Sequence, residues 1–456
     1  MSVLALAPRA GVWAVVAVAA VGTALVTVWQ PLVGLALGLA ALTFALTFRW
    51  PGLGLALALL TLIIGQVGRI PLFGSEVAIL PNDVLIPLVV LAWLARQLVD
   101  RRLTVRASPL RNILLIVSGV LVLSLVVAWL SGAFSNRQLL VAGSYILRWF
   151  EYLALFFLAR SVVRTNTLWS WLVFFGLITL ALAGLGFLQL SVVPDFSAYV
   201  PQGWDPHVGR LLATWFDPNF LAGFLGFAVV LFLSLATERV TGRWFSLGVA
   251  AVAIVALVLT FSRSGYLGFM VGFGVLAIVR ARHFLSLGVL ALLVTFLFVP
   301  RVQERVIGIR SLDETAQLRI ESWRNALEVI ADHPWLGVGY NTYRYVQVRY
   351  GFLDDVARHS AGGSDSSLLT IAVTTGVVGL MVFLALLARM LQSAWMAARL
   401  TRDPTVRALG YGFVAGLLGL IVHGQFVNGL LYPHLLEVQW VMLGLLLGCR
   451  DQEKRV

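Results

Sequence analysis

Charged residues are scarce in this chain. Only 12% of its 456 residues are Asp, Glu, Lys or Arg, whereas a soluble domain usually carries about 25%. Hydrophobic residues make up 60%, which leaves too little polar surface to cover a water-soluble fold of this length. The composition therefore excludes a set of soluble domains and predicts a protein whose main solvent is lipid.

Lysine and cysteine are nearly absent. Lys454 is the single lysine among 33 basic residues, and Cys449 is the single cysteine. One cysteine permits no intrachain disulfide and no cysteine-based metal site. The arginines give a formal charge of +12, but they are scattered in short segments between apolar runs, as topology determinants are. We therefore expect no nucleic-acid partner.

Apolar runs long enough to cross a membrane recur along the whole chain. A span needs about 20 residues, or about 17 at the least. We therefore predict an all-α, polytopic membrane protein with about 12–14 transmembrane helices, in which residues 1–456 form a single membrane domain. The runs lie near 11–29, 31–48, 50–66, 83–99, 112–130, 138–159, 167–190, 217–236, 244–261, 265–280, 284–300, 366–388, 407–428 and 434–449.

Basic residues divide unequally between the two sets of short connections. One set, with the termini, carries twenty, and the other carries four, namely Arg69, Arg137, Arg210 and Arg263. By the positive-inside rule, we expect both termini in the cytoplasm and the protein in the cytoplasmic (inner) membrane. Two segments on the predicted outer side exceed what a connection requires, a shorter outer loop at 191–216 and a large extracytoplasmic loop at 301–365. Long loops of this kind are usually functional.

The large loop contains a predicted helix. The tetrapeptide SLDE at 311–314 fits a capping box, and the helix should run to about Ile330, before His333-Pro334 ends it. Arg319 and Trp323 are four residues apart and should share a face. The two glycines of the following HPWLGVGYN segment, at 333–341, permit a close backbone approach but are weak evidence for a phosphate-binding turn.

Arg148 and Glu151 are charged residues within a predicted span. They are three residues apart and should lie on one face of the helix. Because charge inside a membrane is costly, the two residues call for a partner or a function. We favour a buried structural ion pair, and a substrate role is the alternative.

The predicted outer side gathers residues that could bind a phosphate. Arg263 lies in a polar break, TFSRSG at 260–265, which a plain turn would also explain. Arg210 precedes Asp217 and Asn219, two residues that can cap the next helix. Arginine binds phosphate groups bidentately and keeps its charge, so such a cluster fits a lipid phosphate or pyrophosphate.

A second polar group precedes the run near 366–388. Gly362 and Gly363 form a flexible turn, after which Ser364 or Asp365 can cap the helix. His359 lies just before this turn, where an ordinary exposed loop histidine is equally expected. The other histidines stand isolated, without carboxylates at ligand spacing, so we predict no metal site.

Four of these segments resemble, in the same order, motifs of the O-antigen ligase and polymerase superfamily of bacterial polytopic glycosyltransferases. They cover about 170 residues, from 210 to 380. The segments are RLLATWFDPN at 210–219, TFSRSGYLG at 260–268, RIESWRNALEVIADHPWLGVGYNTY at 319–343 and DSSLLTIAVTTGVVGL at 365–380.

The resemblance implies a GT-C-like helical fold and a metal-independent enzyme without a cofactor. Its implied reaction is transfer of a glycan from an undecaprenyl-pyrophosphate donor to a lipid or polysaccharide acceptor, on the outer face of the membrane. The donor pyrophosphate would be bound by residues matching Arg263 and Arg319, with Arg210 as a looser match. Ligase and polymerase differ in the acceptor, so the resemblance leaves both open.

The catalytic position departs from the family pattern. Ligases of this family carry a His-Asn-x-x-Leu motif where the last helix begins, and here the matching position is Asp365, in DSSLL at 365–369. Either Asp365 acts as the base, or His359 reaches in, or the chemistry differs. A lipid-linked glycan flippase or transporter without chemistry is the rival hypothesis, although such a protein should carry polar residues and broken helices near the middle of the membrane. A non-enzymatic partner in a cell-envelope complex is a third.

Overall fold

The computed structural model describes residues 30–72, 77–101, 108–202, 204–238, 242–280, 303, 314–354 and 362–453. The predicted spans near 11–29 and 284–300 therefore lie outside the described residues. So do most of the predicted capping box at 311–314 and the candidate base His359.

The described part of the chain is almost entirely helical, so the all-α prediction is confirmed. Each of the twelve predicted runs within it coincides with a helix. These helices are α2 (Pro31–Arg49), α3 (Pro51–Ile64), α4 (Pro81–Val99), α5 (Arg111–Leu130), α6 (Asn136–Val162), α7 (Leu168–Val192), α8 (Pro218–Thr237), α9 (Arg243–Leu259), α10 (Arg263–Arg280), α15 (Ser367–Leu400), α16 (Pro404–His423) and α17 (Pro433–Glu453).

Eight helices among the described residues are long and apolar enough to cross a membrane, and α3 and α9 are shorter apolar helices. The chain is therefore membrane-embedded. Two helices, α13 (Glu314–Asp332) and α14 (Tyr343–Arg349), lie in the large loop. The structure also contains a small antiparallel hairpin that the sequence did not predict. It consists of β1 (Ile70–Leu72) and β2 (Val77–Ile79), and Ile70 pairs with Ile79.

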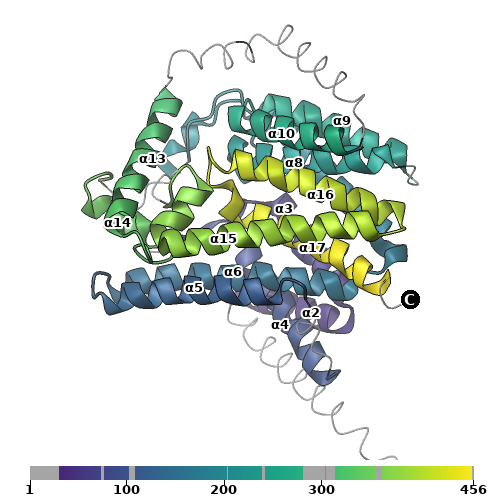
Figure 1. Cartoon of the computed structure of the whole chain (residues 1–456), viewed down its shortest axis with the longest axis horizontal. Coiled ribbons are helices and arrows are strands. Elements are labelled where there is room, and N and C mark those ends of the chain that lie inside the picture. The colour runs from purple at the N-terminus through teal and green to yellow at the C-terminus, as the bar shows by residue number, and fades with distance from the viewer. Residues whose placement is uncertain are drawn as a thin grey trace, which may run out of the picture.

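The bundle has two distinct ends. Figure 1 shows the long helices running side by side, with α13 and α14 at one end and the C-terminus at the other. We call the first the loop end and the second the basic end. At the basic end, the Nε of Arg160 in α6 donates to Asp451 in α17 at 2.7 Å, and Thr401 after α15 donates to Glu453 in α17 at 2.6 Å.

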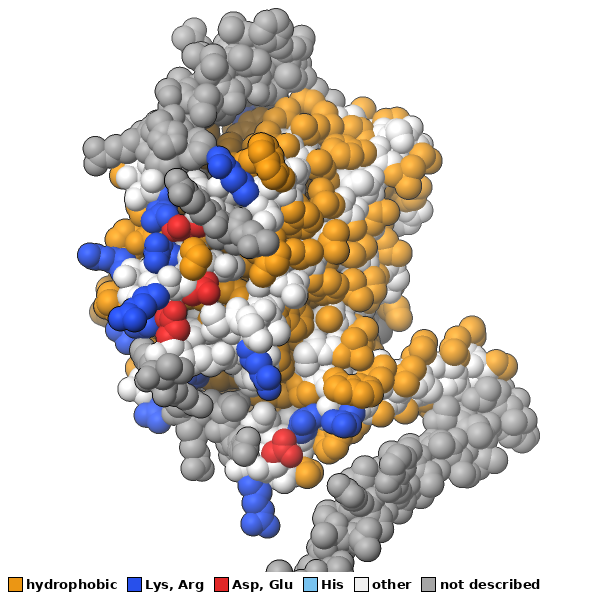
Figure 2. All heavy atoms as spheres, turned by 90° about the vertical axis from the view of Figure 1, so that its right-hand side faces the viewer, with side chains coloured by type: hydrophobic (Ala, Val, Ile, Leu, Met, Phe, Trp, Pro, Cys, Tyr) orange, Lys and Arg blue, Asp and Glu red, His pale blue; other side chains and the backbone are white. Residues whose placement is uncertain are grey.

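Basic side chains gather at the basic end. Figure 2 looks at this end and shows blue side chains, with some red ones, over one part of it beside a broad orange apolar surface. Arg280 at the end of α10 pairs with Glu238 at the end of α8, and Arg407 lies 4.0 Å from the same carboxylate. Arg160, Arg280 and Arg407, which belong to the arginine-rich set of connections, thus lie at this end of the bundle.

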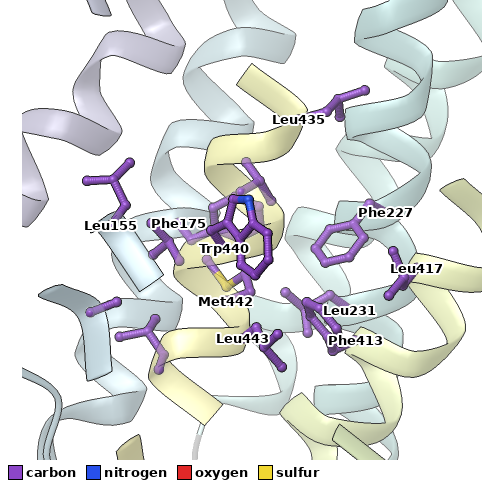
Figure 3. Close-up of a cluster of buried hydrophobic side chains, with 14 of the residues drawn as sticks. Leu155, Phe175, Phe227, Leu231, Phe413, Leu417, Leu435, Trp440, Met442 and Leu443 are labelled. Carbon is purple, nitrogen blue, oxygen red and sulfur yellow. The ribbon is translucent and has the colours of Figure 1, made fainter. Parts of the chain in front are cut away.

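Helix α17 forms the centre of the bundle. Figure 3 shows Trp440 of α17 surrounded by apolar side chains from α6, α7, α8 and α16. Trp440 is 1% exposed, and its ring lies 5.8 Å from Trp149 and 6.0 Å from Phe156, both edge-on. Because lipid is as apolar as this core, close packing contributes most of the stabilisation here.

The HPWLGVGYN segment, residues 333–341, packs against α15 at a break in that helix. Gly376, within α15, has φ 68° and ψ −172°, a conformation that is essentially restricted to glycine. The carbonyls of Val373 and Thr374 accept hydrogen bonds from the amides of Val338 and Gly339, both at 3.0 Å. The glycines of this segment therefore dock the loop onto α15, which explains them without a phosphate-binding turn.

Replacing Gly376 with Ala should lower the free energy of unfolding by about 1–3 kcal/mol. A Cβ at this position would lie 2.1 Å from the carbonyl oxygen of Trp335, which is backbone and cannot move aside easily. Thermal unfolding in detergent measures the effect. The control is Gly184→Ala in α7, where a Cβ would meet no atom within 4 Å and alanine should stabilise the helix slightly. Equal unfolding temperatures for the two variants would contradict this account of the break.

Candidate functional site

Arg210 ties two of the resembling segments together at the loop end. Its Nε donates to the carbonyl of Thr260 at 2.8 Å, and its Nη2 donates to Oδ1 of Asn219 at 3.2 Å. The hydroxyl of Ser262 donates to the same Asn219 oxygen at 2.9 Å. Arg210 thus holds the start of α8 against the connection that precedes α10.

The start of α8 is capped as predicted by Asp217. Its Oδ1 accepts the amides of Asn219 at 2.6 Å and Phe220 at 3.1 Å. Asn219 serves the contact with Ser262 instead of a cap. The side chain of Asp217 is 9% exposed, and Oδ2 accepts no hydrogen bond from the described residues, so one carboxylate oxygen remains available to a ligand.

Arg263 stands at the first position of α10, half-buried, directly after this connection. Two residues before Arg263, Phe261 has φ 49°, a left-handed conformation that is uncommon for a bulky side chain. The hydrogen bonds from Arg210 to the carbonyls on either side, Thr260 and Phe261, help to hold this strained turn. A plain exposed turn needs no such support.

Helix α13 docks on the residues just before α15. The amide of Asp365 donates to Oγ of Ser322 at 3.0 Å, and Nε1 of Trp323 donates to the carbonyl of Asp365 at 3.4 Å. The ring of Trp323 also lies 5.8 Å from Phe426. Arg319, one turn earlier in α13, is close enough for its charge to act on the Asp365 carboxyl.

Asp365 is not the helix cap. Ser366 caps α15, since its Oγ accepts the amide of Leu369 at 3.3 Å. The prediction that Ser364 or Asp365 would cap this helix is therefore wrong by one residue. The Asp365 carboxyl therefore does not cap the helix. It shares a hydrogen bond with the Ser322 side chain, and its backbone is held by Ser322 and Trp323 of α13.

The surroundings of Asp365 act on its protonation in opposite directions. Burial raises the pKa of its carboxyl above the ordinary value, and Arg319 opposes this by favouring the charged form. The negative charges of Asp205 and Asp217 raise the pKa further. The net result is a raised pKa, which suits a carboxylate that takes up a proton during a reaction.

Sequence reasoning missed the contribution of the turn after α16. That helix ends at His423, five residues before the predicted run does, because the chain turns back toward α15. The carbonyl of Gly424 accepts the amide of Ser367 at 2.7 Å, and Gln425 accepts the hydroxyl of Ser366 at 3.2 Å. This turn fixes the start of α15, and no local pattern in it pointed to such a role.

A cluster of possible metal ligands was also missed. Asp205, His207 and Asp217 each offer one ligand atom, and these atoms lie within 4.8 Å of one another. The prediction that every remaining histidine would lack nearby carboxylates is therefore wrong for His207. The spacing of Asp205 and His207 was a signal in the sequence, but the third residue comes from the start of α8.

Arg148 has a different partner from the one predicted. Its Nε donates to Oδ1 of Asp83 at 2.7 Å, and a second nitrogen reaches the other oxygen of Asp83. Oε2 of Glu151 is buried without a hydrogen-bond partner among the described residues. The predicted pair of Arg148 with Glu151 is therefore wrong, because α4 supplies the acid, and both oxygens of Asp83 accept from the Arg148 guanidinium.

Replacing Asp83 with Asn should lower the free energy of unfolding by about 3–5 kcal/mol, because it leaves the Arg148 charge buried and uncompensated. The two side chains are only 12% and 14% exposed. The double variant Asp83→Asn with Arg148→Met removes both charges and should recover much of the loss. Unfolding in detergent compares the three proteins, and a single variant as stable as the parent would show that the pair contributes nothing.

Comparison with known families agrees with the motif resemblance. The family model described as O-antigen ligase matches residues 248–384, so the resemblance to the O-antigen ligase superfamily is confirmed. The matched region contains Arg263, Arg319 and Asp365, and it supports glycan transfer of the O-antigen ligase and polymerase type. None of the curated proteins matches the chain.

Proposed function

Given the match to the O-antigen ligase family, we propose that the protein transfers a glycan from an undecaprenyl-pyrophosphate carrier to an acceptor hydroxyl. The observation that supports this best is the meeting of α13 with the start of α15. It brings Arg319 within electrostatic reach of Asp365, whose backbone is held by Ser322 and Trp323. The start of α8 and the connection before α10 meet at the same end of the bundle.

The roles of the residues follow from the bonds that change. The acceptor oxygen forms a bond to the anomeric carbon of the glycan, and the bond from that carbon to the phosphate oxygen breaks. Arg263 and Arg319 stabilise the negative charge of the departing pyrophosphate. Arg210 supports the segment that carries Arg263. The hydroxyl proton passes to the carboxylate of Asp365, or to His359 if that residue reaches the site.

Acceptor-dependent consumption of the donor tests this proposal. Purified protein in liposomes, given an undecaprenyl-pyrophosphate glycan and a candidate acceptor, should release undecaprenyl pyrophosphate. A lipid or a growing polysaccharide as the productive acceptor separates ligase from polymerase. A flippase would move the intact donor between leaflets and release no undecaprenyl pyrophosphate, which would refute the proposal.

The proposed reaction also requires the loop end to face outward from the cytoplasmic membrane. In a Cys449→Ser background, a cysteine at Ser131, exposed at the loop end, should react with an impermeant maleimide in intact cells with a permeabilised outer membrane. A cysteine at Arg402, exposed at the basic end, should react only after lysis. The reverse pattern would place the site on the cytoplasmic side and contradict the proposed orientation.

A further inference from the structure

Arg69 is an arginine to which the proposed reaction gives no role. It follows the turn after α3 and is one of the four basic residues in the arginine-poor set of connections. Its side chain is half-buried, and the guanidinium carbon lies 4.7 Å from the centre of the Trp204 ring. Among the residues that the structure describes, this guanidinium makes no ion pair and no hydrogen bond. Because a partly buried charge without a counter-charge is costly, Arg69 calls for a ligand.

The turn that carries Arg69 is fastened to the segment before α8. The amide of Gln66 donates to the carbonyl of Thr214 at 2.8 Å, and the hydroxyl of Thr214 donates to the carbonyl of Ile63 at 2.7 Å. Thr214 lies in a short 3₁₀ helix, η4 (Ala213–Trp215), just before α8 begins. These contacts hold Arg69 beside the start of α8, at the end of the bundle where the proposed transfer takes place.

Three aromatic side chains from separate elements lie around Arg69. Trp204 comes from the shorter outer loop, Tyr145 from α6, and Tyr432 directly precedes α17. Both tyrosines are close enough to Arg69 to act on it electrostatically, and Tyr432 is also within electrostatic reach of Asp217. All three rings are half-buried, so each keeps some exposed surface. We call Arg69 and these three rings the Arg69 group.

The chemistry of the Arg69 group indicates its ligand. A guanidinium binds phosphate or carboxylate groups through two N–H donors at once. Burial lowers the pKa of the Arg69 guanidinium, so the charge is held at a cost that a bound anion would offset. The aromatic rings add flat apolar surface against which a sugar ring can pack. The group therefore fits a saccharide that carries an anionic substituent.

The position of the Arg69 group in the sequence favours the acceptor over the donor. The family match covers residues 248–384, which include Arg263 and Arg319, the two arginines assigned to the donor pyrophosphate. All four members of the Arg69 group lie outside that range. Because ligases and polymerases differ in the acceptor, residues that select the acceptor are expected outside the shared region.

We propose that the Arg69 group binds an anionic substituent, a phosphate or a carboxylate, on the acceptor glycan. Arg69 thereby positions the acceptor beside the donor and takes no part in the bonds that change. That the bound saccharide is the acceptor rests on the proposed function, whereas the binding of an anionic saccharide does not.

Binding of a sugar phosphate tests the site without any glycan transfer. Glucose 6-phosphate and its neutral counterpart glucose are titrated separately against the full-length protein in phosphatidylcholine nanodiscs, and saturation-transfer NMR measures binding. Glucose 6-phosphate should bind at least about tenfold more tightly than glucose, and Arg69→Gln should abolish this preference. Arg69→Lys keeps the charge without the planar fork and should retain part of it. Arg137→Gln removes an exposed arginine at the start of α6 and should bind like the parent.

The outcomes separate this inference from the proposed function. Equal binding of the two sugars, or a preference that Arg69→Gln leaves unchanged, overturns the anion site. In the transfer assay, Arg69→Gln should raise the KM for the productive acceptor at least about tenfold, with kcat and the donor KM near those of the parent. A raised donor KM instead, or a productive acceptor without an anionic group, overturns the assignment to the acceptor while glycan transfer stands. If glucose 6-phosphate binds as expected but no donor is consumed, the anion site is real and the proposed function fails.

Discussion

Arg263→Lys and Arg319→Lys are each expected to lower glycan transfer about 10²–10³-fold, the range seen when one preorganised donor to a developing negative charge is removed. Lysine keeps the charge but loses the planar fork that binds two phosphate oxygens. Both arginines are half-buried at the loop end, at the start of α10 and on α13. Initial rates at saturating donor, with membrane insertion checked in parallel, measure the loss.

The matched control is Arg324→Lys. Arg324 lies on the same helix as Arg319 but is exposed. It does not lie on the helix face that Arg319 and Trp323 share. It should keep near-normal activity. If Arg263→Lys and Arg319→Lys also keep near-normal activity, the two arginines are parts of an ordinary turn and a solvated loop helix, and the pyrophosphate site lies elsewhere.

Asp365→Asn is expected to reduce the rate about 10²–10⁴-fold, as removal of a general base does. The substitution is close to isosteric, and the backbone contacts of Asp365 with Ser322 and Trp323 do not depend on its carboxyl. The folded state should therefore persist, and size-exclusion chromatography in detergent checks it. His359→Gln is the paired variant. Full activity in Asp365→Asn together with loss in His359→Gln would move the base to His359.

The dependence on pH follows from the same residue. The pKa of Asp365 is raised, chiefly by burial, so the carboxylate becomes protonated at a higher pH than an ordinary aspartate. The rate of glycan transfer should therefore fall as the pH drops through this raised pKa. The residual rate of Asp365→Asn should not show this fall at low pH. With respect to folding, a raised pKa makes ionisation less favourable in the folded state, so this carboxyl adds no stability above its pKa.

Local patterns predicted the helices and the cap at Asp217 because these depend on residues close in sequence. The twelve helices that coincide with predicted apolar runs required only apolar length, and α13 ends at Asp332, directly before the His333-Pro334 pair. The shared face of Arg319 and Trp323 followed from helical spacing. The resemblance to a known family added the order of the motifs, which spacing alone could not interpret.

Apart from the cap of α15, the errors involve partners that are distant in sequence. Asp83 and Arg148 are 65 positions apart, so a search for a partner on the same helix selected Glu151 instead. Gly337 and Gly339 looked like a weak phosphate motif because the break at Gly376 in α15, on which their segment docks, cannot be recognised from the loop. The sequence explained Asp217 as a helix cap. Capping uses one of its two carboxylate oxygens, so it gave no sign that Asp205 and His207 lie close to Asp217 in the fold.

The central claim is that this loop end breaks the bond between a glycan and a lipid pyrophosphate. The most direct measurement follows a donor labelled separately in the glycan and in the undecaprenyl chain, in liposomes with purified protein and an acceptor. The account predicts equal amounts of transferred glycan and released undecaprenyl pyrophosphate, with both signals lost together in Arg319→Lys. Donor that crosses the bilayer with both labels still joined, at the same rate in the parent and in Arg319→Lys, would contradict it.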